Sequence, residues 1–296
     1  MRNLHIHRSI PDFVGSYVLL STSDNVNTAI FFVHGFMGDS NDTFWAFQYF
    51  CDAAGTPKWW EDVDLYFFSY NSVTDLLSTS TNKWSDFLRW HFPQPPAKLF
   101  KIQAYEMPFR TNDVDIRVRE LGQGYSNAIL VGHSEGAVLI RSDLVNRSRD
   151  GYTRKEAVEL NTDPVLHSLV RLFAPAHLGA CPTGIFGLIF NTPIIKTSAT
   201  MFLDWSKAAT ELRKSPILEH LKESTEELAS QTHLSAYHAD VVFGGDESVV
   251  SVGGFMSDNM HVNVLGHTHT SICKPTHAFD FPLTFVSQER RIAHGS

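Results

Sequence analysis

The sequence predicts an α/β protein built on a mostly parallel central sheet with helices on both faces. Apolar runs of strand length recur along the chain, and segments of helical character separate them. Strands that alternate with helices in this way form a parallel sheet with right-handed crossovers. The clearest unit is residues 128–140, where an apolar run, a glycine-containing turn and a second apolar run follow one another directly.

Length and composition favour a single domain, residues 1–296, that carries one insertion. Hydrophobic residues make up 43% of the chain and aromatic residues 12%, enough to cover a sheet on both faces. The formal net charge of -8 argues against nucleic acid or an anionic membrane as the main partner. The cysteines, Cys51, Cys181 and Cys273, are far apart, which favours reduced thiols and a cytoplasmic setting. No stretch reaches the ~18 apolar residues of a membrane-spanning helix.

The expected strands are apolar runs bounded by turn residues or charged residues. They are residues 17–20 near an edge, 29–33, 63–70, 128–131, 169–174, 237–243 and 261–265. Helices are expected at residues 43–51, at 112–121 and directly after Ser134, and any helix in the aromatic stretch 84–92 ends at the prolines that follow it. A charged linker is expected at residues 146–156.

The pattern changes between residues 181 and 230, where helices joined by loops replace the alternation of strands and helices. The apolar stretch 184–195 has no evident place in a sheet, so we interpret residues 181–230 as a cap or lid insertion. Ser215-Pro216 is a helix start signal. For the second half of this segment, ordinary helices packed on the core are an equal alternative.

The turn in residues 128–140 reads Gly132-His133-Ser134-Glu135-Gly136 and matches the pattern G-x-S-x-G. Glycines on both sides allow a turn so tight that the central serine is exposed in a strained conformation. A strand before the turn and a helix after it are the context that this nucleophile elbow requires. The alternative is a serine in an ordinary turn.

A second glycine-containing loop, His34-Gly35-Phe36-Met37-Gly38, follows the apolar run 29–33. Such a loop at the end of a buried strand can curl so that its backbone N–H groups bind an anion. A plain glycine-rich loop is the alternative.

A serine hydroxyl becomes a nucleophile when an imidazole takes its proton and a carboxylate orients that imidazole. In chain order these groups follow the elbow as serine, acid and histidine. Ser134, then Asp246, then a histidine at 267 or 269 fit this order. Asp240 is a weaker candidate because it lies inside an expected strand, and Glu247 is expected to point elsewhere on the turn.

Together these segments resemble the α/β-hydrolase-fold serine esterases and lipases. The matching pieces are the 34–38 loop, the elbow, Ala174-Pro175-Ala176-His177-Leu178-Gly179, Gly245-Asp246-Glu247-Ser248-Val249-Val250 and the region of His269. Residues 269–275 are similar to the H-x-x-I-C-K-P ending of a lipase-like branch that includes relatives of the GPI inositol-deacylases. That similarity favours His269 over His267 as the base.

The resemblance implies a triad of Ser134, Asp246 and His269 without any cofactor or metal. It also implies an oxyanion hole formed by the backbone N–H groups of Phe36 and Glu135. Substrate contacts are expected from four residues near these positions: His34, Met37, His133 and His177. The Glu135 carboxylate is expected to face a polar network, the alternative being that it raises the pKa of the histidine.

The expected activity is hydrolysis of carboxylic esters through an acyl-enzyme, as in a carboxylesterase or lipase. The apolar segment 184–195 and the aromatic region 84–92 favour an acyl-chain or lipid substrate and a peripheral lipid contact through 184–195. The oligomeric state is left open.

An acyltransferase or a ligand receptor on the same fold are alternatives, because an intact triad permits both. A metal-dependent phosphoesterase is weaker. Gly266-His267-Thr268-His269 and Gly38-Asp39-Ser40-Asn41-Asp42 resemble two of its motifs, but its D-x-H and G-N-H-[DE] motifs are missing.

Overall fold

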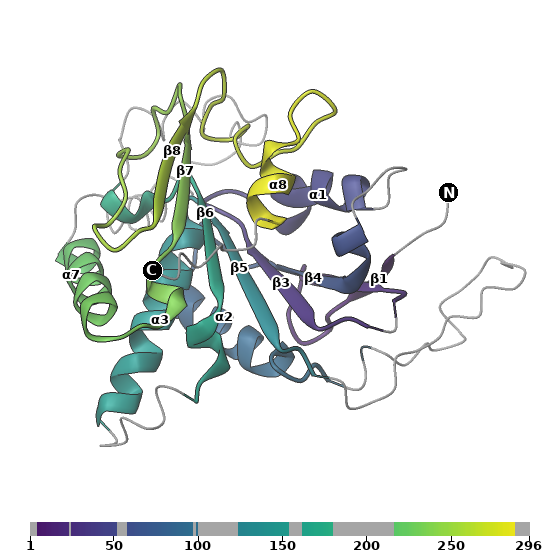
Figure 1. Ribbon diagram of the computed structural model, residues 1–296, viewed down its shortest axis with the longest axis horizontal. Helices are drawn as coiled ribbons and strands as arrows, with labels where there is room; N and C mark the ends of the chain where they lie inside the picture. The colour runs from purple at the N-terminus through teal and green to yellow at the C-terminus, as the bar shows by residue number, and fades with distance from the viewer. Residues whose placement is uncertain are drawn as a thin grey trace, which may run out of the picture.

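The fold is organised around one eight-stranded sheet with the strand order β1-β2-β4-β3-β5-β6-β7-β8 (Figure 1). A computed structural model describes residues 5–23, 25–51, 58–96, 99, 124–153, 162–179 and 216–287. The strands are β1 (His5–Ser9), β2 (Tyr17–Ser21), β3 (Thr28–Val33), β4 (Val63–Phe68), β5 (Asn127–His133), β6 (Leu169–Phe173), β7 (Asp240–Gly244) and β8 (Met260–Val264). β1 and β2 pair antiparallel, as do β2 and β4, and all pairs from β4 to β8 are parallel. The predicted mostly parallel sheet is confirmed.

The two central strands, β3 and β5, are buried on both faces because their apolar side chains meet helices above and below. Their register runs from Thr28 opposite Asn127 to Val33 opposite Gly132. Both strands therefore end at the same level of the sheet, and the loops that follow them meet there. Parallel α/β sheets place their functional loops at this edge.

Helices cover both faces of the sheet. Figure 1 shows α1 (Ser40–Cys51) and α8 (Phe281–Ser287) on one side of the sheet, and α2 (Leu77–His91), α3 (Glu135–Thr153) and α7 (Pro216–Gln231) on the other. α3 packs against both α2 and α7. Short 3-10 helices join these elements: η1 (Lys58–Asp62), η3 (Pro164–His167), η4 (Ala176–Leu178) and η6 (Ser235–Tyr237). None of the helices in the described part of the chain is long and apolar enough to cross a membrane.

Part of the predicted cap lies in the described residues. α7 begins at Pro216, as the start signal predicts, and it buries Leu218, Leu221 and Leu228. Residues 180–215, with the apolar stretch 184–195, lie outside the described residues, and so does the helix expected at 112–121.

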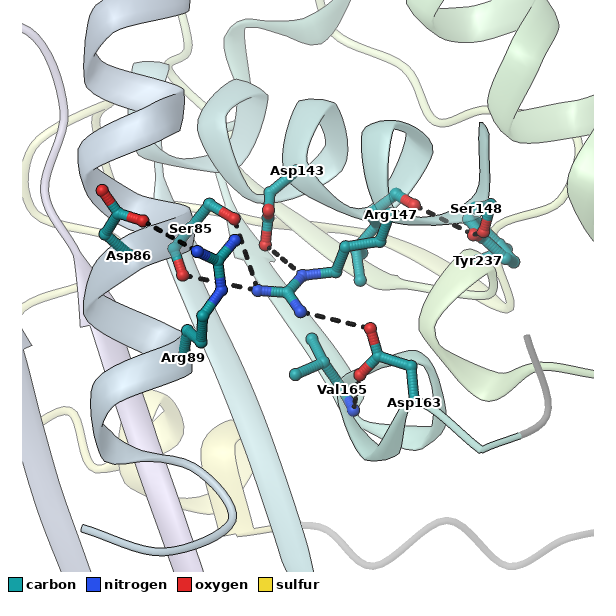
Figure 2. Close-up of polar contacts among 10 residues, drawn as sticks. Ser85, Asp86, Arg89, Asp143, Arg147, Ser148, Asp163, Val165 and Tyr237 are labelled. Carbon is teal, nitrogen blue, oxygen red and sulfur yellow. Dashed lines mark hydrogen bonds and ion pairs between the residues drawn. The ribbon is translucent and has the colours of Figure 1, made fainter. Parts of the chain in front are cut away.

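The prediction of a charged linker from residue 146 was wrong, because α3 continues to Thr153. The arginines of this segment contact different neighbours: Arg149 Nη2 donates to Ser224 Oγ on α7 at 2.8 Å, and Arg147 lies on the α2 side. Arg147 Nε lies 2.9 Å from Asp143 Oδ2 on the previous turn, and Nη1 lies 3.1 Å from Asp163 Oδ2 beside η3 (Figure 2). Arg147 also reaches the backbone carbonyl of Ser85 on α2 at 3.5 Å. One guanidinium thus joins α2, α3 and η3.

A second buried ion pair lies within the sheet itself. Arg171 on β6 pairs with Asp240, its register neighbour on β7. Arg171 Nε also donates a hydrogen bond of 3.0 Å to the carbonyl of Phe285 in α8. The pair therefore fastens the C-terminal helix to the sheet and occupies Asp240.

We expect Arg147→Met to lower the free energy of unfolding by about 3 kcal/mol, because it leaves the buried Asp143 carboxylate without its counter-ion. Arg89→Met is the matched control, since the Arg89–Asp86 pair drawn beside it in Figure 2 is exposed on both sides and such pairs contribute little. Urea unfolding of both variants measures the difference. Equal, small effects would contradict the role given to Arg147.

Candidate active site

Ser134 occupies the turn between β5 and α3 in a left-handed conformation, with φ of 53°. A non-glycine residue holds such a conformation only when its surroundings fix it. The N–H of Ser134 donates to the carbonyl of Phe173 at 3.0 Å, and its carbonyl accepts from the N–H of Ala176 at 3.1 Å. The predicted strand, tight turn and helix are therefore present, and the end of β6 holds the turn in place.

The glycines of this region allow two backbone segments to touch. A Cβ on Gly136 would lie 2.3 Å from the carbonyl oxygen of Val33 and 2.5 Å from that of His34. A Cβ on Gly35 would lie 2.7 Å from the Cβ of Ser134. Contacts this short exclude any side chain at either position. The 34–38 loop therefore packs directly against the serine turn.

His34 holds the 34–38 loop in place through hydrogen bonds to Gly35 and Tyr70. Its ring is fully buried and stacks on Tyr70 with centroids 4.4 Å apart. Nε2 accepts from the N–H of Tyr70 at 3.3 Å, so Nδ1 carries the proton and donates to the Gly35 carbonyl at 2.9 Å. Burial lowers the pKa of His34 to about 4, so the ring is neutral near pH 7. The expected substrate contact by His34 is corrected to a structural role.

The predicted oxyanion residues flank the serine turn. Phe36 follows Gly35, which packs on Ser134, and Glu135 is the first residue of α3, where the helix dipole favours negative charge. The Glu135 side chain is buried, and after burial itself its negative charge is the main cause that raises the pKa of the Tyr70 hydroxyl. This agrees with a Glu135 carboxylate that faces the polar groups under the loop.

Met37 completes the loop with a second left-handed backbone, with φ of 56°. Its N–H donates to Ser72 Oγ at 2.9 Å, and the next N–H, of Gly38, donates to the Gly35 carbonyl at 3.1 Å. Met37 is half-buried and lines a cavity beside the loop.

His269 lies in the segment after β8 and is paired with a carboxylate, but that carboxylate belongs to Glu247. His269 Nδ1 lies 3.0 Å from Glu247 Oε2 and 3.2 Å from Oε1, and both side chains are at most 5% exposed. Glu247 Oε1 also accepts the N–H groups of Val249 at 2.8 Å and Val250 at 3.1 Å. Burial alone would raise the pKa of Glu247, but the His269 contact and these two donors outweigh it and lower that pKa.

The carboxylate paired with His269 is therefore Glu247 and not the expected Asp246. The N–H of Asp246 donates to the carbonyl of His267 at 3.1 Å, and its side chain is exposed to solvent. This hydrogen bond orients the turn after β7 so that the next residue, Glu247, points back toward His269. The sequence shows two adjacent carboxylates, and only the direction of the turn distinguishes them.

Three further histidines, His133, His177 and His267, are held by contacts within the protein. His133 is buried, and its Nε2 donates to the His269 carbonyl at 2.9 Å, with the two ring centroids 4.8 Å apart. Burial, and then the charge of His269, lower the pKa of His133 to about 3.

His177 is buried against Phe255, with ring centroids 4.4 Å apart, and its Nε2 donates to the Gly253 carbonyl at 2.9 Å. His267 stacks on Phe279 at 3.6 Å. His133 and His177 were expected to contact substrate, and in the structure each donates to a backbone carbonyl.

The structure thus gathers Ser134, His133, His269 and Glu247 at one edge of the sheet. Neither the Ser134 hydroxyl nor Nε2 of His269 forms a hydrogen bond with another residue of the described ranges. Because Glu247 accepts from Nδ1, Nε2 is the nitrogen of neutral His269 that can accept a proton. Catalytic hydrogen bonds are often long before substrate binds.

The two segments that resemble phosphoesterase motifs have other roles in the structure. Asp39 accepts the N–H of Asp42 at 2.8 Å near the start of α1, and His269 is paired with Glu247. Within the described ranges, no group of three or more His, Cys, Asp or Glu side chains is arranged to hold a metal ion.

The sequence matches no protein-family model and no curated protein. Among solved structures, phospholipase PlaB from Legionella pneumophila is similar over 89% of this chain at 15% identity, with a TM-score of 0.51. The similarity spans 61% of PlaB, less than two thirds of its length.

Two other similar structures are lipase BlEst2 from Bacillus licheniformis and an α/β hydrolase, MGS-MChE2, from the metagenome of sediments of the Mar Chica lagoon in Morocco. BlEst2 is 13% identical, with 86% of this chain and 89% of its own covered and a TM-score of 0.45. MGS-MChE2 is 11% identical, with 94% and 95% covered and a TM-score of 0.46. The similarity to the GPI inositol-deacylase branch stays a prediction. The strand order, the left-handed turn at Ser134 and the likeness to PlaB show that this chain has the α/β-hydrolase fold.

Proposed function

We propose that the protein is a serine hydrolase that cleaves carboxylic esters with a triad of Ser134, His269 and Glu247. The observation that carries this proposal is the buried Glu247–His269 pair at the edge of the sheet where Ser134 is held in its strained turn. Such a pair serves a base that must accept and then return a proton. The phospholipase among the similar structures, PlaB, has the same fold, which is compatible with this activity.

In the proposed reaction, His269 Nε2 takes the proton of the Ser134 hydroxyl while Oγ bonds to the ester carbonyl carbon. The carbonyl oxygen becomes an oxyanion, which the N–H groups of Phe36 and Glu135 stabilise. When the intermediate collapses, the bond to the alcohol breaks and His269 gives its proton to the leaving oxygen. Water then repeats these steps on the acyl-enzyme and releases the acid.

Glu247 acts through His269. The carboxylate holds the imidazole with Nδ1 protonated and stabilises the imidazolium that forms in each step. The N–H groups of Val249 and Val250 help to keep Glu247 ionised in a site where burial favours the neutral acid. Loss of this charge would leave His269 a weaker base.

The first prediction concerns the nucleophile. Ser134→Ala should abolish labelling by a fluorophosphonate probe and lower kcat for p-nitrophenyl acetate by about 10⁶-fold, because no acyl-enzyme can form. Gel fluorescence and steady-state kinetics measure the two effects, and Ser230→Ala, at an exposed position of α7, controls for non-specific labelling. Labelling of the Ser134 variant would refute the assignment.

The second prediction separates the two adjacent carboxylates. Glu247→Gln should lower kcat by about 10³–10⁴-fold, because an amide can donate to Nδ1 and favour the wrong tautomer of His269. Asp246→Asn should leave kcat nearly unchanged, because that side chain is exposed. A larger loss in Asp246→Asn than in Glu247→Gln would restore Asp246 as the acid.

The third prediction concerns His133 as a positioning residue. His133→Leu removes the donor to the His269 carbonyl and should lower kcat by about tenfold with little change in KM, as expected for one lost buried hydrogen bond. His133→Gln can donate again and should recover much of the loss. Equal activity of the Leu and Gln variants would show that the hydrogen bond has no role.

The pH profile gives an independent measure of the same site. The pKa of His133 is about 3 and that of His34 about 4, so neither histidine titrates between pH 5 and 8. The acid limb of kcat/KM in that window should therefore have a slope of one, from a single proton. A slope of two would mean that a second histidine of the site titrates with it.

A further inference from the structure

A cavity of about 850 Å³ lies beside the 34–38 loop. The proposed reaction of the triad, as described above, assigns no role to this cavity. Its walls come from the β1–β2 connection at residues 12–15, from Met37 and Gly38, from residues 68–73 after β4, and from α2. These segments are far apart in sequence and meet at the carboxyl ends of β3 and β4. The volume is that of a site for a small organic ligand.

The lining of the cavity is mainly apolar. Phe13 contacts the edges of three aromatic rings, with centroid distances of 6.4 Å to Phe68, 5.0 Å to Phe87 and 6.4 Å to Trp90. Val14 is 90% exposed and Trp90 is 48% exposed, so apolar side chains also surround the opening. Exposed apolar groups around a cavity are typical of sites that take up apolar ligands.

Three charged residues line the cavity, Asp12, Lys83 and Asp86, and the two on α2 are paired within the protein. Lys83 Nζ lies 2.8 Å from Asp75 Oδ2, and Asp86 Oδ1 lies 3.3 Å from Arg89 Nη1. Both α2 charges that line the cavity therefore have a counter-ion within the protein. Walls that are mainly apolar, with both α2 charges paired, favour a hydrocarbon chain as the occupant.

Met37 places the cavity next to the proposed oxyanion donor. Met37 lines the cavity and directly follows Phe36, whose N–H is the proposed oxyanion donor. The left-handed backbone of Met37 and its N–H···Ser72 Oγ bond of 2.9 Å fix this junction. An ester carbonyl bound at Phe36 carries its acyl chain on the carbonyl carbon, one bond from the oxyanion.

We propose that this cavity is the acyl-chain subsite and that the substrates are esters of medium-chain or long-chain fatty acids. This inference rests on the proposed function, because it places the acyl chain of the same acyl-enzyme. The chain would pass Met37, lie against the walls formed by Phe13 and Phe68, and reach the opening at Val14 and Trp90.

The test is a series of p-nitrophenyl esters from acetate to dodecanoate. For the wild type, kcat/KM should rise with acyl length. In Trp90→Ala the ratio of kcat/KM for dodecanoate to that for acetate should fall about tenfold. Trp45→Ala is the matched control, because Trp45 on α1 is 56% exposed and lies outside the cavity lining, and its ratio should equal that of the wild type.

A second variant guards against misfolding of Trp90→Ala. Val14→Asp places a charge at the opening on a side chain that is 90% exposed, so it should lower the same ratio without loss of fold by circular dichroism. An unchanged ratio in both variants, or a wild type that prefers acetate, would overturn the acyl-chain subsite.

The outcomes also separate this inference from the proposed function. If Ser134→Ala still hydrolyses acetate, the triad fails, whatever the chain-length ratio shows. If acetate hydrolysis depends on Ser134 but the ratio is insensitive to Trp90 and Val14, only the subsite is wrong. A parallel series of acetate esters with longer alcohols completes the design, since an effect of Trp90→Ala confined to that series would assign the cavity to the leaving group and overturn the proposal.

Discussion

The contact on which the site depends is the one between the ends of β3 and β5, where the backbone of the 34–38 loop touches the serine turn. Gly35 and Gly136 make this contact possible, because any Cβ there would overlap Ser134 or the carbonyl oxygens of Val33 and His34. Parallel pairing in register brings the two strand ends to the same level. Serine and proposed amide donors therefore become neighbours through backbone packing, before any side chain contributes.

Around this contact the protein keeps His34 and His133 neutral and its proposed acid charged. His34 and His133 are buried, each donates from one ring nitrogen to a backbone carbonyl, and burial lowers the pKa of both. The side chain of Glu247 is also buried, but three hydrogen bonds favour its carboxylate. Buried surroundings thus leave the two histidines neutral, whereas the N–H donors around Glu247 keep its carboxylate charged.

The sheet and the serine turn were predictable from the sequence because each has a local cause: continuous apolar strands, and glycines where backbones touch. The partner of His269 was not, because Asp246 and Glu247 differ only in direction, and a hydrogen bond from Asp246 to the distant His267 sets that direction. The roles of His34, His133 and His177 were also out of reach, since a buried histidine and a substrate-facing one look alike in sequence. Glu247 carries no local sign that would have identified it.

The Arg171–Asp240 pair lies well inside the sheet, but it bears on the segment that holds His269. This segment starts from β8 and ends at α8, and the Phe285 carbonyl in α8 is tied to Arg171. The segment that carries His269 is therefore fixed at both ends, by β8 and by α8. His133 fixes it at a third point, through its hydrogen bond to the His269 carbonyl. Folding therefore already restricts the conformational freedom of the His269 imidazole. Less conformational entropy has to be lost to orient this ring in each catalytic cycle.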